Sequence, residues 1–321
     1  MGNKSKEDAP RFRIFRKFKG HGCIDKTGKE VIPCKYDHLG GFYEGLAYVD
    51  LDDKWGFIDK SGKEVIPCRY DDAGNFSEGL ARVLRDDKWG FIDKSGKEVI
   101  PCRYDDAGHF SEGLAFVELD GEYVYIDKTG KEVITCRYDY YVDLFDEDSD
   151  YYFSEGLAKV SLDGLYGYID KTGKEVIECS YDKAGVFCEG LAYVSLDGKY
   201  GYIDKSGKEV IPCKYDYSYD FSEGLAMVKL DGKYGYIDKS GKEVIPCKYD
   251  STYHFCEGLA VRLDGKKGCI DKTGKEVIPC KYDDIYDFSE GLAEVSLDDS
   301  HLAWIDKKGK EVVVFDYCNY W

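Results

Sequence analysis

Short runs of alternating apolar and polar residues follow one another along the chain, separated by clusters of Asp, Lys and Gly. Residues 46–51, Leu-Ala-Tyr-Val-Asp-Leu, and residues 55–58, Trp-Gly-Phe-Ile, are rich in strand-forming residues. Residues 64–70 form a third run, in which Pro67 lacks an N–H and therefore indicates an edge or bulged strand. The pattern predicts a three-stranded antiparallel meander with turns at 52–54 and 59–62.

This unit repeats with a period near 34 residues. The tripeptide Ile-Asp-Lys begins at nine positions, 24, 58, 92, 126, 169, 203, 237, 270 and 305. A fixed period of this size is the signature of a repeat architecture. We expect a disordered lead at residues 1–10, followed by a single array over residues 11–321. Its nine copies span roughly 12–45, 46–79, 80–113, 114–156, 157–190, 191–224, 225–258, 259–291 and 292–321.

The apolar residues of each unit lie on both faces of the predicted sheet. On the third strand we expect Ile66, Cys68 and Tyr70 on one face and Val65 and Pro67 on the other. Because both faces are apolar, neighbouring units should cover them. The predicted fold is all-β, a tandem array of nine three-stranded antiparallel units packed face to face. An open superhelical, β-solenoid-like stack is favoured, and a closed β-propeller-like ring is the alternative, because nine units exceed the usual number of blades.

The second turn is the most constant part of the repeat. Its glycine recurs in all nine copies, at 28, 62, 96, 130, 173, 207, 241, 274 and 309. A left-handed backbone, in which a Cβ would cost roughly 1 kcal/mol or more, explains a glycine here. The aspartate before it can accept hydrogen bonds from N–H groups of the turn. The structural turn residues named on this basis are Asp59, Gly62, Asp93, Gly96, Asp204 and Gly207.

The copies differ mainly in the loop that follows the third strand, which is too long for a tight hairpin and suits a crossover. Variation confined to loops on a constant frame is typical of a recognition surface, although relaxed drift in solvent also produces it. Tyrosine suits such a surface because it offers a large contact area at low entropic cost. The candidate binding residues in these loops are Tyr217, Tyr219, Tyr253 and Tyr286.

Two copies depart further from the pattern. The loop at 140–152 is nine residues longer than its counterparts (43 − 34), and it adds the candidate binding residues Tyr140, Tyr141, Phe145, Asp146, Asp148, Asp150 and Tyr151. Its Asp-x-Asp-x-Asp run resembles the start of a calcium loop, but Tyr151 and Leu157 stand where Gly and Glu are needed, so no metal is expected. Copy eight lacks one residue in its first strand, at 259–263, which predicts a shifted pairing or a bulge.

Charge and cysteine content narrow the function classes. With 63 acidic and 45 basic residues the net charge is −18, which disfavours nucleic acid and anionic membranes and suits a basic protein partner or simply high solubility. The sequence has no apolar run long enough to span a membrane, and residues 1–10 lack the apolar core of a secretion signal, so we expect neither feature. Eight of 13 cysteines share one repeat position, as expected of free thiols in a reducing compartment, and we expect a cytoplasmic protein.

No constellation of chemistry-bearing residues distinguishes one copy from the others. Acidic pairs occur as equal members of the copies, the five histidines lie in unlike contexts, and no phosphate-binding loop is present. We therefore expect no enzyme activity, no cofactor and no metal. Oligomeric state is left open.

The repeat resembles the WG-repeat (KWG) family over residues 12–315. The likeness rests on Gly-Leu-Ala-x-Val, Asp-Lys-Trp-Gly-Phe-Ile-Asp-Lys-x-Gly-Lys-Glu-Val-Ile-Pro and Tyr-Asp, although only copies two and three contain Trp-Gly. The resemblance implies no catalytic residues. The favoured function is a non-catalytic scaffold for protein–protein interaction through the variable acidic, Tyr-rich loops. The alternatives are a carbohydrate- or cell-surface-binding module and a structural or self-assembling array.

Overall fold

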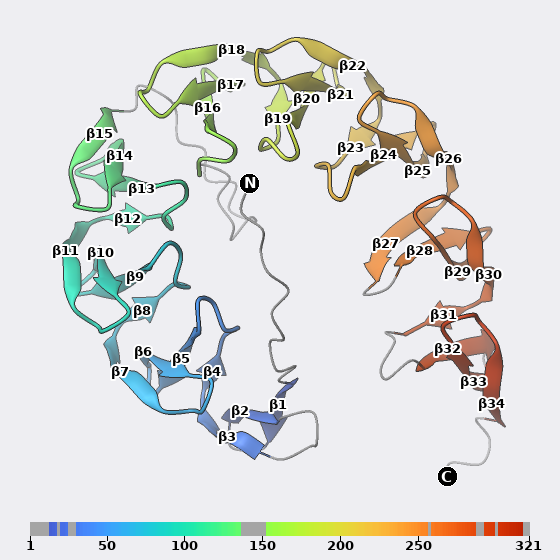
Figure 1. The fold of residues 1–321 in the computed structure, drawn as a ribbon, viewed down its shortest axis with the longest axis horizontal. Helices are drawn as coiled ribbons and strands as arrows, with labels where there is room; N and C mark the ends of the chain where they lie inside the picture. Colours follow the sequence, from blue (N-terminus) through green and yellow to red (C-terminus); the bar gives the residue numbers. More distant parts are fainter. Residues whose placement is uncertain are drawn as a thin grey trace. The chain divides into compact units, whose positions relative to one another are not determined.

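A computed structural model describes residues 13–17, 20–24, 30–135, 152–255, 258–286, 292–298 and 301–316. The chain divides into two compact units, residues 1–163 with 168–175, and residues 164–167 with 176–321. All elements in the described part are β-strands, and they form nine antiparallel sheets of three or four strands (Figure 1). The predicted all-β array is confirmed.

The first unit contains four complete sheets, in each of which consecutive strands are neighbours. The first consists of β1 (Arg13–Lys17), β2 (Gly20–Ile24) and β3 (Glu30–Tyr36). The second consists of β4 (His38–Leu39), β5 (Leu46–Leu51), β6 (Lys54–Asp59) and β7 (Glu64–Tyr70). The third consists of β8 (Asp72–Ala73), β9 (Leu80–Arg85), β10 (Lys88–Asp93) and β11 (Glu98–Tyr104). The fourth consists of β12 (Asp106–Ala107), β13 (Leu114–Leu119), β14 (Glu122–Asp127) and β15 (Glu132–Thr135).

The division between the units falls within the sheet of β16 (Leu157–Leu162), β17 (Leu165–Asp170) and β18 (Glu175–Tyr181). The second unit then repeats the same order four times. Its sheets consist of β19 (Lys183–Ala184), β20 (Leu191–Leu196), β21 (Lys199–Asp204) and β22 (Glu209–Tyr215), then β23 (Tyr217–Ser218), β24 (Leu225–Leu230), β25 (Lys233–Asp238) and β26 (Glu243–Tyr249). They continue with β27 (Ser251–Phe255), β28 (Gly258–Leu263), β29 (Lys266–Ile270) and β30 (Glu276–Tyr282), then β31 (Asp284–Ile285), β32 (Leu292–Asp298), β33 (His301–Asp306) and β34 (Glu311–Asp316).

Seven of the described sheets carry a fourth, short strand that the sequence pattern did not reveal. The second and third sheets show its origin: β8 begins at the second residue after β7 and pairs with β9, with Asp72 opposite Leu84. The rest of the expected crossover loop closes as a hairpin, because Ser77 and Leu80 exchange backbone hydrogen bonds of 2.9 and 3.1 Å. The crossover itself is therefore short, and the long loop belongs to the next sheet.

In six of the described sheets the third long strand is bulged opposite the glycine of the repeat. Phe57 of β6 pairs with Ile66 and Trp55 pairs with Tyr70, so two steps on β6 span four on β7. The extra residues lie over Gly56, where an added Cβ would be 2.5 Å from the Ile66 carbonyl oxygen. The bulge predicted from the proline is confirmed.

The bulge also overturns the expected common face of Ile66, Cys68 and Tyr70. Ile66 and Tyr70 pack with the following sheet, whereas Cys68 packs against the core shared with the preceding sheet. A bulge shifts the alternation of side chains, which period-two reasoning does not anticipate.

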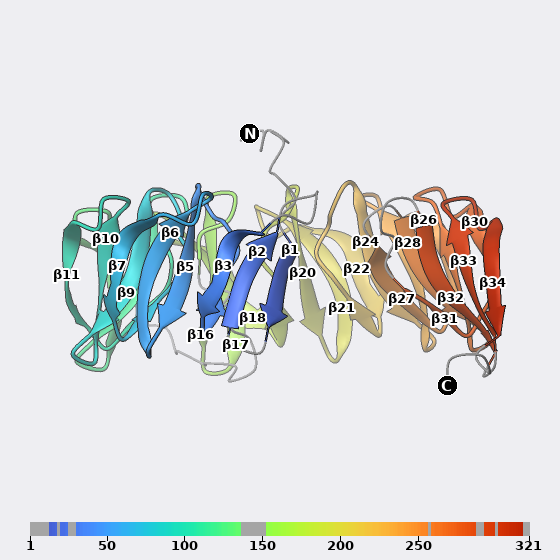
Figure 2. The same cartoon turned by 90° about the horizontal axis from the view of Figure 1, so that it is seen from below.

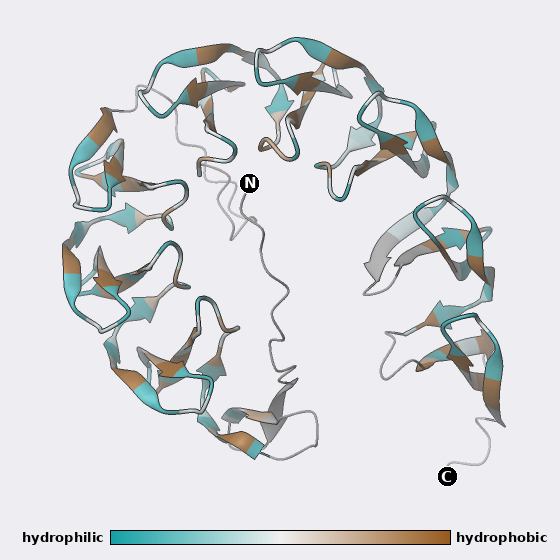
Figure 3. Cartoon of the chain, viewed as in Figure 1, coloured by the Kyte–Doolittle hydropathy of each residue, from teal (hydrophilic) through white to brown (hydrophobic). Residues whose placement is uncertain are grey.

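The expected cover over Val65 and Pro67 is also absent, because both side chains are exposed. They lie on an edge strand, at the opposite side of the sheet from β4. In the first unit β7 and β11 run along one side and β4, β8 and β12 along the other (Figure 1). Figure 3 shows apolar segments between hydrophilic ones on these edge strands.

Apolar cores fill the spaces between consecutive sheets within each unit. Phe57 of β6 and Phe76 of the next sheet's loop are buried and make an edge-to-face contact with ring centroids 4.8 Å apart. Such contacts between copies stabilise a repeat array, because a single small sheet is only marginally stable. The turns lie at the two ends of the strands (Figure 2).

Copy eight confirms the predicted shift of pairing. Leu259 lies opposite Ile270, the place that Ala226 takes opposite Ile237 in the preceding copy. The missing residue is thus accommodated before Val261, and β27 extends to five residues.

Candidate functional site

The aspartate and glycine of the second turn adopt the predicted roles. Asp59 Oδ1 accepts hydrogen bonds from the Ser61 amide at 2.8 Å, the Ser61 hydroxyl at 2.6 Å and the Lys63 amide at 3.1 Å. The Ser61 hydroxyl is the largest cause of the lowered pKa of Asp59. Gly62 has φ of +80°. The same arrangement occurs at Asp93 with Gly96 and at Asp204 with Gly207.

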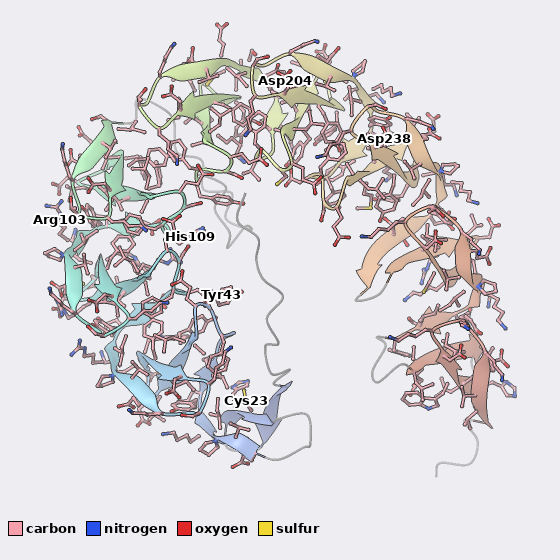
Figure 4. All side chains as sticks on the ribbon, in the orientation of Figure 1. Cys23, Tyr43, Arg103, His109, Asp204 and Asp238 are labelled. Carbon is pink, nitrogen blue, oxygen red and sulfur yellow. The ribbon has the colours of Figure 1, made fainter. Side chains whose placement is uncertain are left out.

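Each turn also packs against the preceding sheet, which is a second reason for its glycine. A Cβ on Gly96 would lie 3.2 Å from Cγ1 of Ile66, and one on Gly62 would lie 3.2 Å from Cγ1 of Ile32. Arg69 Nη2 of β7 donates to the Gly96 carbonyl at 3.1 Å. Figure 4 labels Asp204 and Asp238 at two such turns of the second unit. The turns therefore connect copies as well as strands.

Two further acidic positions of the repeat also join neighbouring sheets. Glu44 Oε2 accepts the Gly79 amide of the next loop at 3.1 Å and pairs with Lys94 at 2.9 Å. Asp71 pairs with Lys54 at 2.5 Å and accepts the Asp86 amide at 3.1 Å, and both contacts lower its pKa, that with Lys54 most. These carboxylates therefore stabilise the contact between neighbouring sheets.

At each variable loop one large side chain fills the same place, and it comes either from the first long strand or from the loop itself. Where the third loop residue is Gly, as at Gly40, the first long strand supplies a large residue that fills the space, here Tyr48. A Cβ on Gly40 would lie 2.4 Å from the Tyr48 ring. Gly185 with Tyr193 shows the same exchange. In the sheets that begin with β23 and β31 the loop supplies Tyr219 or Tyr286, and the strand residue is Met227 or Glu294.

Tyr217 and Tyr219 form the best-defined part of the predicted surface. Their side chains are 41% and 45% exposed, and their rings meet edge to face with centroids 5.0 Å apart. Tyr217 also contacts the Tyr200 ring at 5.2 Å. The buried Tyr202 hydroxyl donates to the Tyr219 carbonyl at 2.7 Å, which fixes the loop from below. Two exposed rings are thus held in place by buried neighbours.

The other predicted binding residues are not brought together with this pair. Tyr286, 52% exposed, follows β31 in another sheet. Tyr253 lies on β27, and its side chain is outside the described residues. The remaining predicted residues also lie outside the described part of the chain: Tyr140, Tyr141, Phe145, Asp146, Asp148, Asp150 and Tyr151.

Near the start of the first unit, the fold brings together a group of residues that the sequence analysis did not identify. The rings of His21, His38 and Trp55 follow one another at centroid distances of 5.9 Å. Asp50 pairs in register with both His38 and Trp55, is only 6% exposed, and has an Oδ1 without a hydrogen-bond partner in the described region. Burial raises the pKa of Asp50. A comparison of the copies could have singled out Asp50, because other copies have Leu84, Ser161 or Ser195 at this position.

The described cysteines are free thiols, and most are half-buried. Burial raises the pKa of Cys247 and of Cys269 to about 11, so these thiols stay protonated at neutral pH. Among the described residues no cluster of His, Cys, Asp and Glu fits a metal ion. In that part of the chain no helix has the length and apolar character needed to cross a membrane.

The family model for the WG-containing repeat matches the chain eight times, from residue 22 to residue 299. The chain belongs to the WG-repeat family. The matches cover residues 22–55, 55–89, 89–123, 125–166, 166–200, 200–234, 234–266 and 268–299. Each begins near the position that Trp55 and Trp89 occupy, at the start of the middle strand.

No curated protein was found to match the chain. Among solved structures, "the eukaryotic initiation factor" is similar, with 10% identity, a TM-score of 0.59 and coverage of 94% of this chain and 95% of that one. The computationally designed Ika8 protein shows 13% identity and a TM-score of 0.46, covering 90% and 100%. BamB from Moraxella catarrhalis shows 12% identity and a TM-score of 0.43, covering 78% and 93%. Only the first likeness bears on the fold, and none bears on function.

Proposed function

We propose that this WG-repeat chain is a non-catalytic scaffold that binds a protein partner through its variable loops, with Tyr217 and Tyr219 at the centre. The observation that carries the proposal is the exposure of these two rings on a loop that buried groups hold rigid. Exposed aromatic rings with little freedom to lose on binding are typical interface hot spots. The net charge of −18 suits a basic partner.

The test compares two tyrosine variants in affinity purification from an extract of the organism that makes the protein. The double variant Tyr217→Ala/Tyr219→Ala should lose a partner that the wild type retains, about tenfold or more in recovery, as removal of two hot-spot rings predicts. Tyr43→Ala is the matched control, because Tyr43 is 52% exposed on the equivalent loop side of the first unit (Figure 4). Equal recovery with all three proteins would contradict the proposal.

The same variants separate the two alternatives. Binding on a glycan array that disappears with the double variant would favour a carbohydrate-binding module. Concentration-dependent oligomers of the wild type in light scattering, lost in the double variant, would favour self-assembly. The free thiols support a cytoplasmic location, which fractionation of cells would test.

A further inference from the structure

The edge strand β18 differs from its counterparts in two ways that both concern binding of another strand. Six copies have a proline in the middle of this strand, at 33, 67, 101, 212, 246 and 279, whereas β18 has Glu178. Seven other copies have Lys or Arg just before the final Tyr, at 35, 69, 103, 137, 214, 248 and 281, whereas β18 has Ser180. Prolines and basic residues are the usual means by which proteins keep edge strands from pairing with other chains.

The backbone of β18 has an amide that pairing within its own sheet does not require. A Cβ on Gly167 would lie 2.5 Å from the Ile177 carbonyl oxygen and 2.7 Å from the Cys179 nitrogen, so these two groups face β17. The residue between them is Glu178, whose amide stands where six other copies have a proline nitrogen. Six copies place a proline nitrogen there without loss of the sheet, which shows that this amide is not needed for pairing with the neighbouring strand.

The side chains of β18 leave an aromatic ring without the cation that covers its counterparts. In the six described copies with a basic residue, its charge lies over the next tyrosine ring, 4.7 to 5.1 Å from the centroid. Those tyrosines are nearly inaccessible, between 0% and 4% exposed. Tyr181, which follows Ser180, is instead half-buried.

The exposed carboxylate of Glu178 favours a basic segment as the partner of β18. Glu178 is exposed, and in the described part of the chain it has no ion pair. The Ser180 hydroxyl donates to the Glu178 carbonyl at 3.3 Å, a weak bond that a partner's amide can replace. Two other described edges, β15 and β34, also lack the proline. β15 ends at Thr135, before the positions that correspond to Ser180 and Tyr181, and the side chains of β34 after Val313 lie outside the described residues.

We propose that β18 is a docking edge for an extended, basic segment of a partner protein. The segment adds to the sheet as a further strand, accepting a hydrogen bond from the Glu178 amide. One of its lysines or arginines takes the place over Tyr181 that the chain's own basic residue occupies in other copies, next to the Glu178 carboxylate. This site is separate from the tyrosine pair of the variable loops.

The test uses two variants that return β18 to the sequence of its neighbours. Glu178→Pro removes the amide donor, and Ser180→Lys supplies the chain's own cation over Tyr181. Both residues occur at these positions in other copies, so the fold should persist. The probe is an acetylated eight-residue peptide of alternating Lys and Val, with a Glu and Val peptide as the charge control.

The Lys and Val peptide should slow hydrogen exchange of the Glu178 amide in the wild type, and the Glu and Val peptide should not. Each variant should bind the basic peptide about tenfold more weakly. A converse variant, Pro212→Glu/Lys214→Ser in β22, should gain a second site. No protection at Glu178, or equal binding by the wild type and both variants, would overturn the proposal. Should Glu178→Pro fail to fold, Ser180→Lys decides alone.

Discussion

Single residues that differ from their counterparts in other copies give individual copies properties that the repeat pattern does not predict. Asp50 is the clearest case, because its carboxylate is buried without a full set of partners. Asp37 and Asp53 raise its pKa further, and His38 opposes them. Buried acceptors without partners reduce stability, so Asp50 is a position of strain in the first unit.

Asp50→Ser should stabilise the protein at pH 7 by about 1 kcal/mol, since it removes a buried, incompletely satisfied charge. Ser161 and Ser195 occupy the same position in other copies, so the smaller residue fits. The folded pKa of Asp50 is raised, so the folded state binds the proton more tightly than the unfolded state. The wild type therefore recovers stability as pH falls through the folded pKa.

Urea unfolding of both proteins at pH 7 and at pH 4 measures this effect. The advantage of Asp50→Ser should shrink at the lower pH. Ser195→Ala, in the same position of the second unit, is the control for loss of a buried hydroxyl. An Asp50→Ser protein that is less stable than the wild type at pH 7 would show that the carboxylate has a partner in solution.

At the scale of the element, the second turn combines two constraints in one glycine. Gly96 has φ of +80°, and a Cβ there would also meet Ile66 of the preceding sheet. Gly79, at the end of the variable loop, has φ of +88° but no atom within 4 Å of a Cβ. Substitutions at these two glycines therefore distinguish the cost of the left-handed backbone from the cost of disturbing the contact between sheets.

Gly79→Ala should destabilise the protein by about 1 kcal/mol, because only the left-handed backbone opposes the Cβ. Gly96→Ala should cost about 2–3 kcal/mol, since it also displaces Ile66 from the interface. Thermal and urea unfolding of the two variants gives the difference. Equal losses would mean that the turn does not press on the preceding sheet.

The sequence was sufficient to predict the three long strands and the turns of each copy, and insufficient to predict the short fourth strand and the packing between strands. Asp59, Gly62 and Pro67 predicted the turns and the bulged edge strand because their backbone requirements are local. The short strand of Asp72 and Ala73 was missed, since two residues show no periodicity. The face of Cys68 was wrong because a bulge changes the alternation. Tyr217 and Tyr219 could be named from loop variation, but their contact depends on the fold of the loop.

The whole molecule depends on one motif used many times, so a change in conditions that acts on the turn acts everywhere at once. In all eight described turns the pKa of the aspartate is lowered from 3.8, in seven of them chiefly by a Ser or Thr hydroxyl and at Asp306 by backbone amides. These carboxylates stabilise the fold above the unfolded pKa, and their contribution is lost as pH falls through the folded value. Protonation would also leave the 45 basic residues unopposed.

We therefore expect cooperative acid unfolding that begins just below pH 3.8, the ordinary pKa of these carboxyls, when circular dichroism and tryptophan fluorescence are followed. Asp204→Asn keeps an acceptor oxygen in one turn but cannot titrate, so that variant should be less stable than the wild type at pH 7 and lose less on acidification. Asp197→Asn, in the first turn of the same sheet, changes the net charge equally and controls for it. If both variants followed the wild-type acid transition in parallel, general charge repulsion rather than the turn would govern the stability of the array.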